Sequence, residues 1–364
     1  MFATLNLPSP PTYGIKYAGS KLKLIPHILE LARPLGVKRV LDGFSGTTRV
    51  SQALAQSAYS VISNDRAEWS RVFGVCFLLN RQPKSYFQPL IDELNALPGM
   101  DGWFTENYGG DGNKRGEKKP WQYHNTRKID AVREKIDEYR LSDTEKCVLL
   151  ASLMLAMDEV ESTLGHFCSY LNEWSPRSYQ TMHLKVPEFF FHDGSHAVWQ
   201  RDVFDILPNV EADLAYFDPP YGSNNEKMPP SRVRYAGYYH IWKTVVLNDR
   251  PSLFGRAGRR KDSSDAEGYS PFEDFRKDET GKFIALNAVE RMLEQTRARY
   301  VLLSYGSGGR ATADELMQSI TNVGALIKFV KVDYKKNVMA EMKWTREWVS
   351  EQKPYQEYLF LMEK

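Results

Sequence analysis

Short apolar runs alternate along this chain with amphipathic stretches, and turn-forming residues separate them. Apolar runs of strand length occur at residues 37–41, 60–63, 214–217, 300–305 and 355–362. Helical spacing follows the first run over about residues 48–57, and a further helix is expected from about residue 312. Strands that are apolar on both faces and alternate with helices are typical of a parallel sheet covered on both sides. We therefore expect an α/β fold: a mostly parallel, twisted sheet of about seven strands, with helices on both faces.

The pattern becomes mainly helical between about residues 68 and 198. Apolar residues recur at helical spacing over residues 129–139, and Ser142 and Glu145 have the spacing of a capping box at the start of a further helix. A largely helical region is therefore predicted as an insertion in the sheet domain. The predicted parts are a first sheet portion at 1–67, the insertion at 68–198 and a second sheet portion at 199–364.

The run Leu214–Phe217 ends at a carboxylate and a rigid turn. Asp218 follows the predicted strand directly, and then come Pro219, Pro220 and Tyr221. In open α/β sheets ligands bind beyond the carboxyl ends of the strands, and two prolines leave backbone carbonyls as acceptors. Two acceptors beside an aromatic ring can hold a planar exocyclic amine, such as a nucleobase amino group. These four residues are candidate catalytic residues, although a strand that ends in a Pro-Pro turn with a surface tyrosine has the same sequence.

A second candidate site lies in the first strand–helix–strand unit. Asp42, Phe44 and Gly46 occupy the turn after the first strand, and Asp65 follows the second strand, 23 residues after Asp42. An acidic residue at about this distance can accept hydrogen bonds from both hydroxyls of a ribose. The turn lacks the G-x-G-x-x-G pattern of dinucleotide-binding proteins, and the Asp42 carboxylate disfavours phosphate but suits a cationic ligand such as S-adenosylmethionine. An ordinary strand–helix–strand unit with no cofactor is the alternative.

Asp202 and Val203 precede the 214–217 strand by about a dozen residues, so they are expected at the end of a neighbouring strand. There Asp202 can accept a hydrogen bond from an adenine amino group, or it can cap a turn. Both residues are included among the candidate cofactor-binding residues.

Two polar segments carry basic and aromatic residues together. The first lies within residues 103–125, where a basic loop separates two aromatic clusters, and the second is a long stretch from 223 to 282. Cations bind phosphates and amides bind base edges, so both are candidate nucleic-acid contacts. So long an irregular stretch as 223–282 is usually functional or mobile, whereas a solvated loop flanked by core aromatic residues fits the first segment equally well. The candidate contacts are Lys114, Arg115, Lys118, Lys119, Tyr239, His240, Trp242, Arg259 and Arg260.

Composition narrows the class of protein. With 48 basic and 46 acidic residues the formal net charge is +2, so any affinity for nucleic acid must come from local basic patches. Three cysteines without paired spacing suit a reduced compartment. The longest apolar helical run, 147–157, is too short to span a bilayer, and the first residues lack a secretory pattern. We therefore expect a cytoplasmic protein with no membrane partner.

The order and spacing of four segments resemble a known enzyme family. Residues 17–21, 42–47, 65 and 218–222 are similar to the motifs of the Dam-like, DPPY-motif adenine-specific DNA methyltransferases, which include modification enzymes of restriction systems. The resemblance covers nearly the whole chain. It implies a Rossmann-like methyltransferase fold, an inserted DNA-recognition domain, S-adenosylmethionine as cofactor, double-stranded DNA as substrate and a cognate restriction endonuclease as a further partner. Thr48 and Ser20 stand where the family usually has glycine.

The resemblance also implies roles for individual residues. Asp65 would bind the ribose of the cofactor, Asp202 would lie near its adenine, and Tyr17 and Lys21 would lie near its methionine part. A target adenine flipped out of the duplex would stack on the tyrosine of the 218–221 motif, while the aspartate and the first proline carbonyl accept hydrogen bonds from its amino group. The implied reaction is direct methyl transfer to N6, with no covalent enzyme intermediate and no metal.

Two other classes of function are kept as alternatives. The first is a methyltransferase acting on a different amino group: cytosine N4 in DNA, adenine in RNA, or a protein amide. Aspartate before the two prolines favours adenine, but four residues do not encode the substrate polymer. The second is a DNA-binding homologue that has kept the fold and lost activity.

Overall fold

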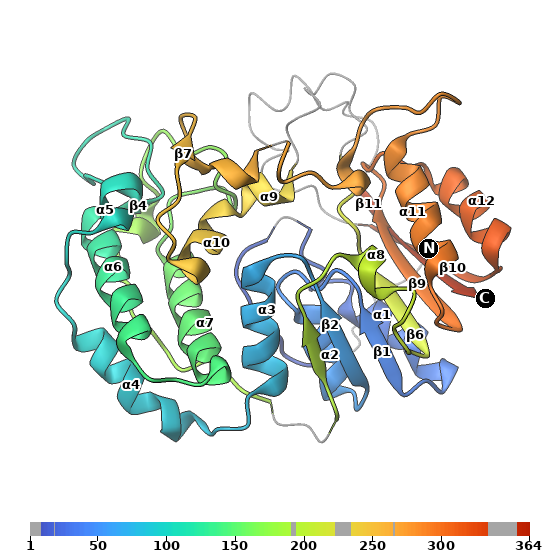
Figure 1. Cartoon of the computed structure of the whole chain (residues 1–364), viewed down its shortest axis with the longest axis horizontal. Coiled ribbons are helices and arrows are strands. Elements are labelled where there is room, and N and C mark those ends of the chain that lie inside the picture. Colours follow the sequence, from blue (N-terminus) through green and yellow to red (C-terminus); the bar gives the residue numbers. More distant parts are fainter. Residues whose placement is uncertain (1–8, 18, 191–193, 223–233, 265, 334–354) are drawn as a thin grey trace.

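The computed structural model describes residues 9–17, 19–190, 194–222, 234–264, 266–333 and 355–364. The motif residue Ala18 and the first part of the predicted long loop, 223–233, lie outside the described residues. Within these ranges, a sheet domain and a helical region lie side by side (Figure 1).

Among the described residues, the main sheet has seven strands in the order β10-β11-β9-β6-β1-β2-β5. Strands β9, β6, β1, β2 and β5 pair in parallel, and β11 is antiparallel to both β9 and β10. This confirms the predicted α/β fold with a mostly parallel sheet. The bounds are β1 Arg39–Asp42, β2 Ser60–Asn64, β5 Ala197–Trp199, β6 Leu214–Phe217, β9 Tyr300–Gly306, β10 Ala325–Asp333 and β11 Gln356–Glu363.

Side chains of the central strands alternate between the two faces of the sheet, and helices cover each face. On one face Val40, Tyr216 and Leu302 pack with α1 and α2. On the other face Phe217 and Leu303 pack with α8, α11 and α12. All five side chains are at most 1% exposed, and each contributes about 1.5–3 kcal/mol by burial. The covering elements are α1 Ile25–Ala32, the 3₁₀ helix Arg33–Leu35, α2 Arg49–Gln56, α8 Val203–Ile206, α11 Ile284–Gln295 and α12 Ala313–Val323.

The insertion between β2 and β5 is mainly helical and has its own core. The predicted capping box is present at its longest helix, α7: the Ser142 hydroxyl accepts from the Glu145 amide, and the Glu145 carboxylate accepts from the Ser142 amide. No helix in the described ranges is both long and apolar enough to cross a membrane. The elements are α3 Glu68–Gly74, a π-helical turn Val75–Leu79, α4 Lys84–Ala96, α5 Trp103–Tyr108, β3 Gly109–Gly110, β4 Trp121–Gln122, α6 Tyr123–Glu138, α7 Asp143–Glu159 and a 3₁₀ helix Pro176–Tyr179.

The prediction of an irregular stretch over residues 223–282 is wrong from residue 234 onward. Ile241, Trp242 and Val245 lie on α10 and are buried in the same core cluster as the inserted helices. The part around α10 therefore belongs with the helical region, although it follows β6 in sequence, whereas Phe272 packs in the core of the sheet domain. Three apolar residues at helical spacing were hidden among basic ones. The elements are α9 Tyr235–Tyr238, α10 His240–Leu247, the hairpin strands β7 Leu253–Phe254 and β8 Arg259–Arg260, and 3₁₀ helices at Lys261–Ser263 and Pro271–Glu273.

Replacing Trp242 tests this placement. Trp242→Ala removes a side chain that is 1% exposed, so we expect it to destabilise the protein by about 3–5 kcal/mol. The measurement is the midpoint of denaturant unfolding. Lys114→Ala, at an exposed position, is the control and should leave the midpoint unchanged. An unaltered midpoint for the Trp242 variant would contradict the buried position.

Candidate active site

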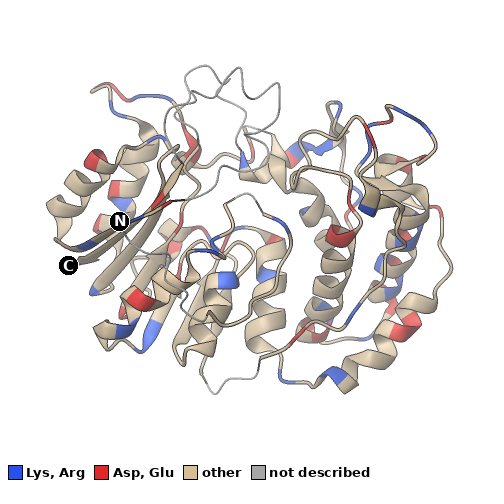
Figure 2. Ribbon diagram, turned by 180° about the vertical axis from the view of Figure 1, so that it is seen from behind, with Lys and Arg blue, Asp and Glu red and all other residues tan. Residues whose placement is uncertain are grey.

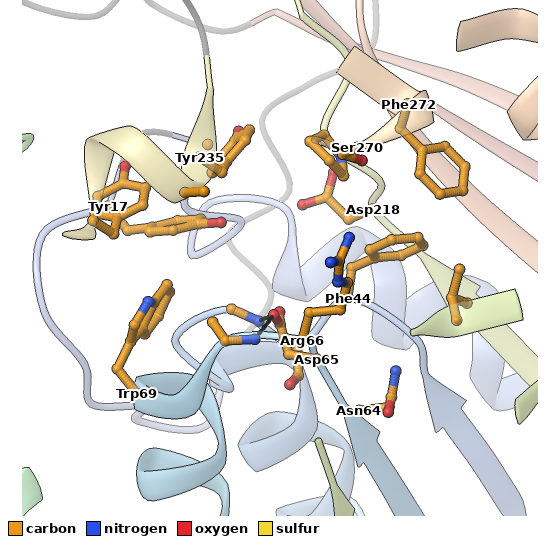
Figure 3. Close-up of a pocket in the computed structure, with 18 of the residues that line it drawn as sticks. Tyr17, Phe44, Asn64, Asp65, Arg66, Trp69, Asp218, Tyr235, Ser270 and Phe272 are labelled. Atoms are coloured by element: carbon orange, nitrogen blue, oxygen red, sulfur yellow. Dashed lines mark hydrogen bonds between the residues drawn. The ribbon is translucent and has the colours of Figure 1, made fainter. Parts of the chain in front are cut away.

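A cavity of about 340 Å³ opens at the carboxyl ends of β1, β2 and β6. Figure 3 shows Tyr17, Tyr235 and Trp69 on one side of it and Asp218 and Phe272 on the other. All the predicted cofactor-binding residues line this cavity: Tyr17, Lys21, Asp42, Phe44, Gly46, Asp65, Asp202, Val203 and Asp218. The structure therefore brings together residues that are up to 201 positions apart, from Tyr17 to Asp218.

The turn after β1 allows a close approach to the backbone. A Cβ at Gly43 would lie 2.7 Å from the Phe217 ring, and Gly46 has φ +49° beneath the Tyr17 ring. Thr48 also has a left-handed backbone, with φ 60°. This conformation favours glycine, which accounts for the glycine usual at this position in the resembled family. The Thr48 hydroxyl accepts a hydrogen bond from the side-chain amide of Gln52 at 3.1 Å.

Asp42 is a buried carboxylate with spare hydrogen-bonding capacity. It is 1% exposed, and its Oδ2 accepts from the Ser51 hydroxyl at 2.6 Å. Its Oδ1 has no hydrogen-bond partner in the described part of the chain. Burial raises the pKa of Asp42 to about 7, against the lowering effect of the Ser51 hydrogen bond. A cationic ligand in the cavity would compensate this carboxylate.

Asp65 and Asp202 are each held by backbone amides at the cavity wall. Asp65 accepts from the Gly46 amide at 2.8 Å and the Ala67 amide at 2.9 Å, and burial raises its pKa although these hydrogen bonds oppose the change. Asp202 caps α8 by accepting from the Phe204 amide at 3.0 Å. Of the two roles predicted for Asp202, the structure shows the capping role, and the residue also faces the cavity.

An aromatic wall faces these carboxylates, and most of it was not predicted. The Tyr17 ring stacks on Tyr239 with centroids 4.7 Å apart and lies 5.6 Å from Trp69. Trp69 and Tyr235 line the cavity but were not among the predicted site residues. The tyrosine-rich run at 235–239 was a signal for this wall, since aromatic faces can hold a planar ring or a cation.

The four predicted catalytic residues do not all face the cavity. Asp218 and Pro220 line it, whereas Tyr221 is 9% exposed and packs against Tyr305 at 4.9 Å between centroids. The Tyr221 hydroxyl donates to Glu357 Oε1 at 3.1 Å. The description of Tyr221 as an open stacking surface is therefore corrected for this structure, because a buried acceptor holds its hydroxyl.

Lys21 links the Asp218 carboxylate to a residue that sequence reasoning missed. Its Nζ lies 3.0 Å from Asp218 Oδ1 and 3.6 Å from Glu357 Oε2. Burial raises the pKa of Asp218 to about 7, Lys21 opposes this change and Glu357 adds to it. Glu357 comes from β11, near the end of the chain, where the sequence around it shows only a strand pattern.

Two of the residues predicted to contact DNA have side chains that are buried in the protein. Trp242 belongs to the helical core. Arg260 is 2% exposed and pairs with Asp249 at 2.6 Å and Asp262 at 2.9 Å. Both predictions are wrong, because α10 and β8 bury these side chains.

Tyr239 and His240 line the cavity instead of the outer surface. Both are buried, at 2% and 1% exposure. Burial lowers the pKa of His240 to about 3, so the ring is neutral near pH 7 and offers no charge to a phosphate. Contact of these two residues with DNA stays a prediction, and it would take place inside the cavity.

The remaining predicted contacts differ in exposure. Lys114, Arg115 and Lys118 are exposed, in a loop region at the edge of the helical part where Figure 2 shows several basic segments. Lys119 donates to the Asn107 carbonyl at 2.6 Å. Arg259 is half-buried and donates to the Ser263 carbonyl.

The described residues contain no group of three or more histidine, cysteine or acidic side chains arranged to hold a metal ion. The cavity instead combines carboxylates, aromatic rings and a glycine turn. Such a combination can bind a ligand that carries a cation, hydroxyl groups and a flat ring.

Comparison with known proteins decides the family. The model of the D12 class N6 adenine-specific DNA methyltransferases matches residues 17–273, which include Tyr17, the β1 turn and the 218–221 motif. The chain belongs to this class. The D12-class match ends at residue 273, so β9, β10 and β11 lie beyond it.

Relatives of the D12-class chain are modification enzymes with low sequence identity. It is 24% identical over 369 residues to modification methylase StsI of Streptococcus sanguinis, covering 96% of this chain and 52% of that protein. It is 27% identical over 323 residues to modification methylase LlaI of Lactococcus lactis subsp. lactis, covering 83% and 48%. For type II methyltransferase M.NlaIII of Neisseria lactamica the identity is 25% over 332 residues, covering 88% and 92%. The D12-class chain thus spans about half the length of the first two relatives.

The pH dependence of stability tests the burial of Asp42. Its pKa is about 7 in the folded protein and about 4 in an unfolded chain. The folded state therefore binds a proton that the unfolded state lacks, and Asp42 contributes stability that is lost as pH rises through 7. The loss develops between about pH 4 and pH 7, so we expect Asp42→Asn to raise the melting temperature relative to wild type at pH 8 but to change it little at about pH 4.

The measurement is thermal unfolding at both pH values. Asp205→Asn, on the exposed side of α8, is the matched control and should give no pH-dependent difference. Equal changes at pH 8 and about pH 4 for the Asp42 variant would show that its carboxyl is not perturbed.

Proposed function

We propose that this chain transfers a methyl group from S-adenosylmethionine to the N6 amino group of a flipped adenine in double-stranded DNA. The observation that carries the proposal is the position of Asp218. The carboxylate that opens the Asp-Pro-Pro-Tyr motif lies at the end of β6 and lines the same cavity as Asp42, Asp65 and Asp202. Acceptors for an amine and a cofactor-sized cavity therefore meet at one sheet edge.

The cavity residues fit S-adenosylmethionine. The unpartnered Asp42 Oδ1 and the neighbouring carboxylates suit the positive charges of the molecule. Asp65 would accept hydrogen bonds from its ribose, Asp202 and Val203 would lie at its adenine, and Tyr17 and Phe44 offer flat faces. When bound, the cofactor supplies a methyl group activated by its sulfonium charge.

The protein's own contribution to transfer is to hold and polarise the target amine. Asp218 and the Pro219 carbonyl would accept the two N–H bonds of the adenine amino group, which directs the nitrogen lone pair out of the ring plane. The adenine must leave the duplex for this contact, at a cost of about a few kcal/mol. Tyr221 would stack on the base only after its ring turns away from Tyr305.

The names of the relatives suggest the biological setting. Modification methylases and type II methyltransferases appear among them, so we propose a role in a restriction-modification system, with a cognate restriction endonuclease as partner. The exposed Lys114, Arg115 and Lys118 of the helical region would bind DNA phosphates.

The deciding experiment is transfer of labelled methyl from S-adenosylmethionine to unmethylated duplex DNA, followed by nucleoside analysis. N6-methyladenine is the expected product. N4-methylcytosine, or transfer only to RNA or protein, would replace the proposed substrate. Cofactor binding without any transfer would leave the chain without the proposed activity.

Replacing the catalytic carboxylate separates chemistry from binding. Asp218→Ala should abolish transfer because it removes one amine acceptor, while S-adenosylmethionine still binds in a titration. Glu211→Ala, an exposed carboxylate just before β6, is the matched control and should keep wild-type transfer. Normal turnover by the Asp218 variant would reject the assignment.

Replacing the three exposed basic residues tests the DNA contact. Lys114→Ala, Arg115→Ala and Lys118→Ala combined should weaken DNA binding and reduce the salt dependence, by a slope of about 0.9 for each lost phosphate contact. Cofactor affinity should not change. Lys328→Ala, exposed on β10, serves as control. An unchanged salt slope for the triple variant would place the DNA elsewhere on the protein.

A further inference from the structure

Three buried ionisable side chains meet beneath the catalytic turn. Lys21 Nζ lies between Asp218 Oδ1, at 3.0 Å, and Glu357 Oε2, at 3.6 Å. The exposed fractions of the three side chains are 5%, 14% and 3%. One ammonium group thus stands between two carboxylates in a site almost without water.

The position of Glu357 is fixed from two directions. Strand β11 is antiparallel to β9, and Glu357 pairs with Gly306 in that ladder. Its Oε1 accepts from the hydroxyls of Tyr221 and Tyr355, at 3.1 Å and 3.0 Å. Its Oε2 has no hydrogen-bond partner in the described part of the chain and faces Lys21. The carboxylate is therefore held in place on one side and directed toward the ammonium on the other.

Lys21 contacts both carboxylates and two further acceptors at the same time. Its ammonium donates to the Gly19 carbonyl at 3.1 Å and to the Tyr221 hydroxyl at 3.4 Å. Neither Asp218 Oδ1 nor Glu357 Oε2 has a hydrogen-bond partner among the described residues. The two ion-pair distances differ by only 0.6 Å, from 3.0 to 3.6 Å. A small displacement of the ammonium would therefore change which carboxylate it neutralises.

We propose that Glu357 is a positioning residue for methyl transfer: it holds Lys21 as a shared counterion that moves toward Glu357 when the target amine binds Asp218. This inference rests on the function proposed above. Glu357 lies outside residues 17–273, which the family model matches, and outside the four motif segments in the sequence. Its contribution arises from the fold of this chain.

The shared counterion keeps the site compensated throughout the reaction. The N6 atom gains the methyl group, the electron pair of the broken sulfur–carbon bond stays on sulfur, and the proton that N6 loses passes to Asp218. Lys21 occupies one side of the Asp218 carboxylate, at Oδ1, so its movement toward Glu357 would open that oxygen to the amine. Once Asp218 is protonated, the ammonium remains paired with Glu357, so no buried charge is left alone.

Other titratable groups also face Asp218. Asp42 is affected by the Asp218 charge, and burial raises the pKa values of the neighbouring tyrosines, which keeps them neutral near pH 7. Lys21 and Glu357 therefore dominate the charge balance at Asp218. The tyrosines are Tyr17, Tyr216, Tyr221 and Tyr235.

Glu357→Gln tests the proposal in single-turnover methylation of duplex DNA across pH. Without the second carboxylate, Lys21 pairs with Asp218 alone, which favours ionised Asp218 but obstructs the amine. We expect the transfer rate to fall about tenfold and the acid limb of the pH–rate profile to move to lower pH by about one unit. Glu363→Gln is the matched control: it removes a carboxylate of the same strand that pairs with Arg299 at 2.7 Å, away from Asp218, and should leave the acid limb in place.

A wild-type rate and an unmoved acid limb for Glu357→Gln would overturn the inference. If that variant does not fold, Glu357→Asp carries the test, because it keeps the charge but withdraws it by one methylene. We then expect a slower rate with the acid limb in place, and a wild-type rate would reject a positioning role. If the wild-type protein methylates adenine and both Glu357 variants behave like it, only this inference is rejected. Wild-type protein that methylates nothing removes the proposed function as well.

Discussion

Burying several carboxylates at one edge of a parallel sheet is the constraint on which this structure depends. Asp42, Asp65 and Asp218 follow β1, β2 and β6, and parallel strands end at the same edge. Each carboxylate loses water there, so each needs a compensating group. The Ser51 hydroxyl donates a hydrogen bond to Asp42, and backbone amides donate to Asp65. Lys21 forms an ion pair with Asp218. The incomplete compensation is what prepares the cavity for a positively charged ligand.

The elements around this edge limit its contact with water. An aromatic wall that includes Tyr17 and Trp69 closes the side opposite Asp218, and Phe44 packs edge-on against Phe272 at 5.2 Å. Low exposure strengthens every charge interaction inside. The same desolvation that makes the acidic edge costly would strengthen its attraction for a cation.

Local sequence patterns predicted the sheet and the acidic part of the site. Strand β6 has the predicted bounds, and Asp42, Asp65 and Asp202 line one cavity because each follows or neighbours the end of a strand. The apolar pattern shows where a strand ends, and parallel pairing brings those ends together. The predicted basic loop residues Lys114 and Arg115 are exposed because they occupy a loop without apolar spacing.

The rest of the site depends on contacts that no local pattern encodes. Glu357 reaches Lys21 through the antiparallel pairing of β11, across more than 300 residues of sequence. Tyr221 turns inward because its hydroxyl donates a hydrogen bond to Glu357, which is distant in sequence. Trp242 and Arg260 lie in a basic stretch, yet both are buried. Trp242 packs in the helical core, and Arg260 pairs with Asp249. Side-chain direction and long-range pairing decide these cases, and neither has a periodic signature.

The return of α10 to the helical region limits how far the protein can be divided into independent parts. The core of that region includes Ile15 from the start of the chain and is otherwise built from two separate pieces, one before β5 and one after β6. A fragment cut at 68–198 would lack Ile241 and Trp242, and the apolar side chains that pack against them would be exposed to water. An exchange of this region between related proteins must therefore carry both pieces, which are encoded at two separate places in the gene.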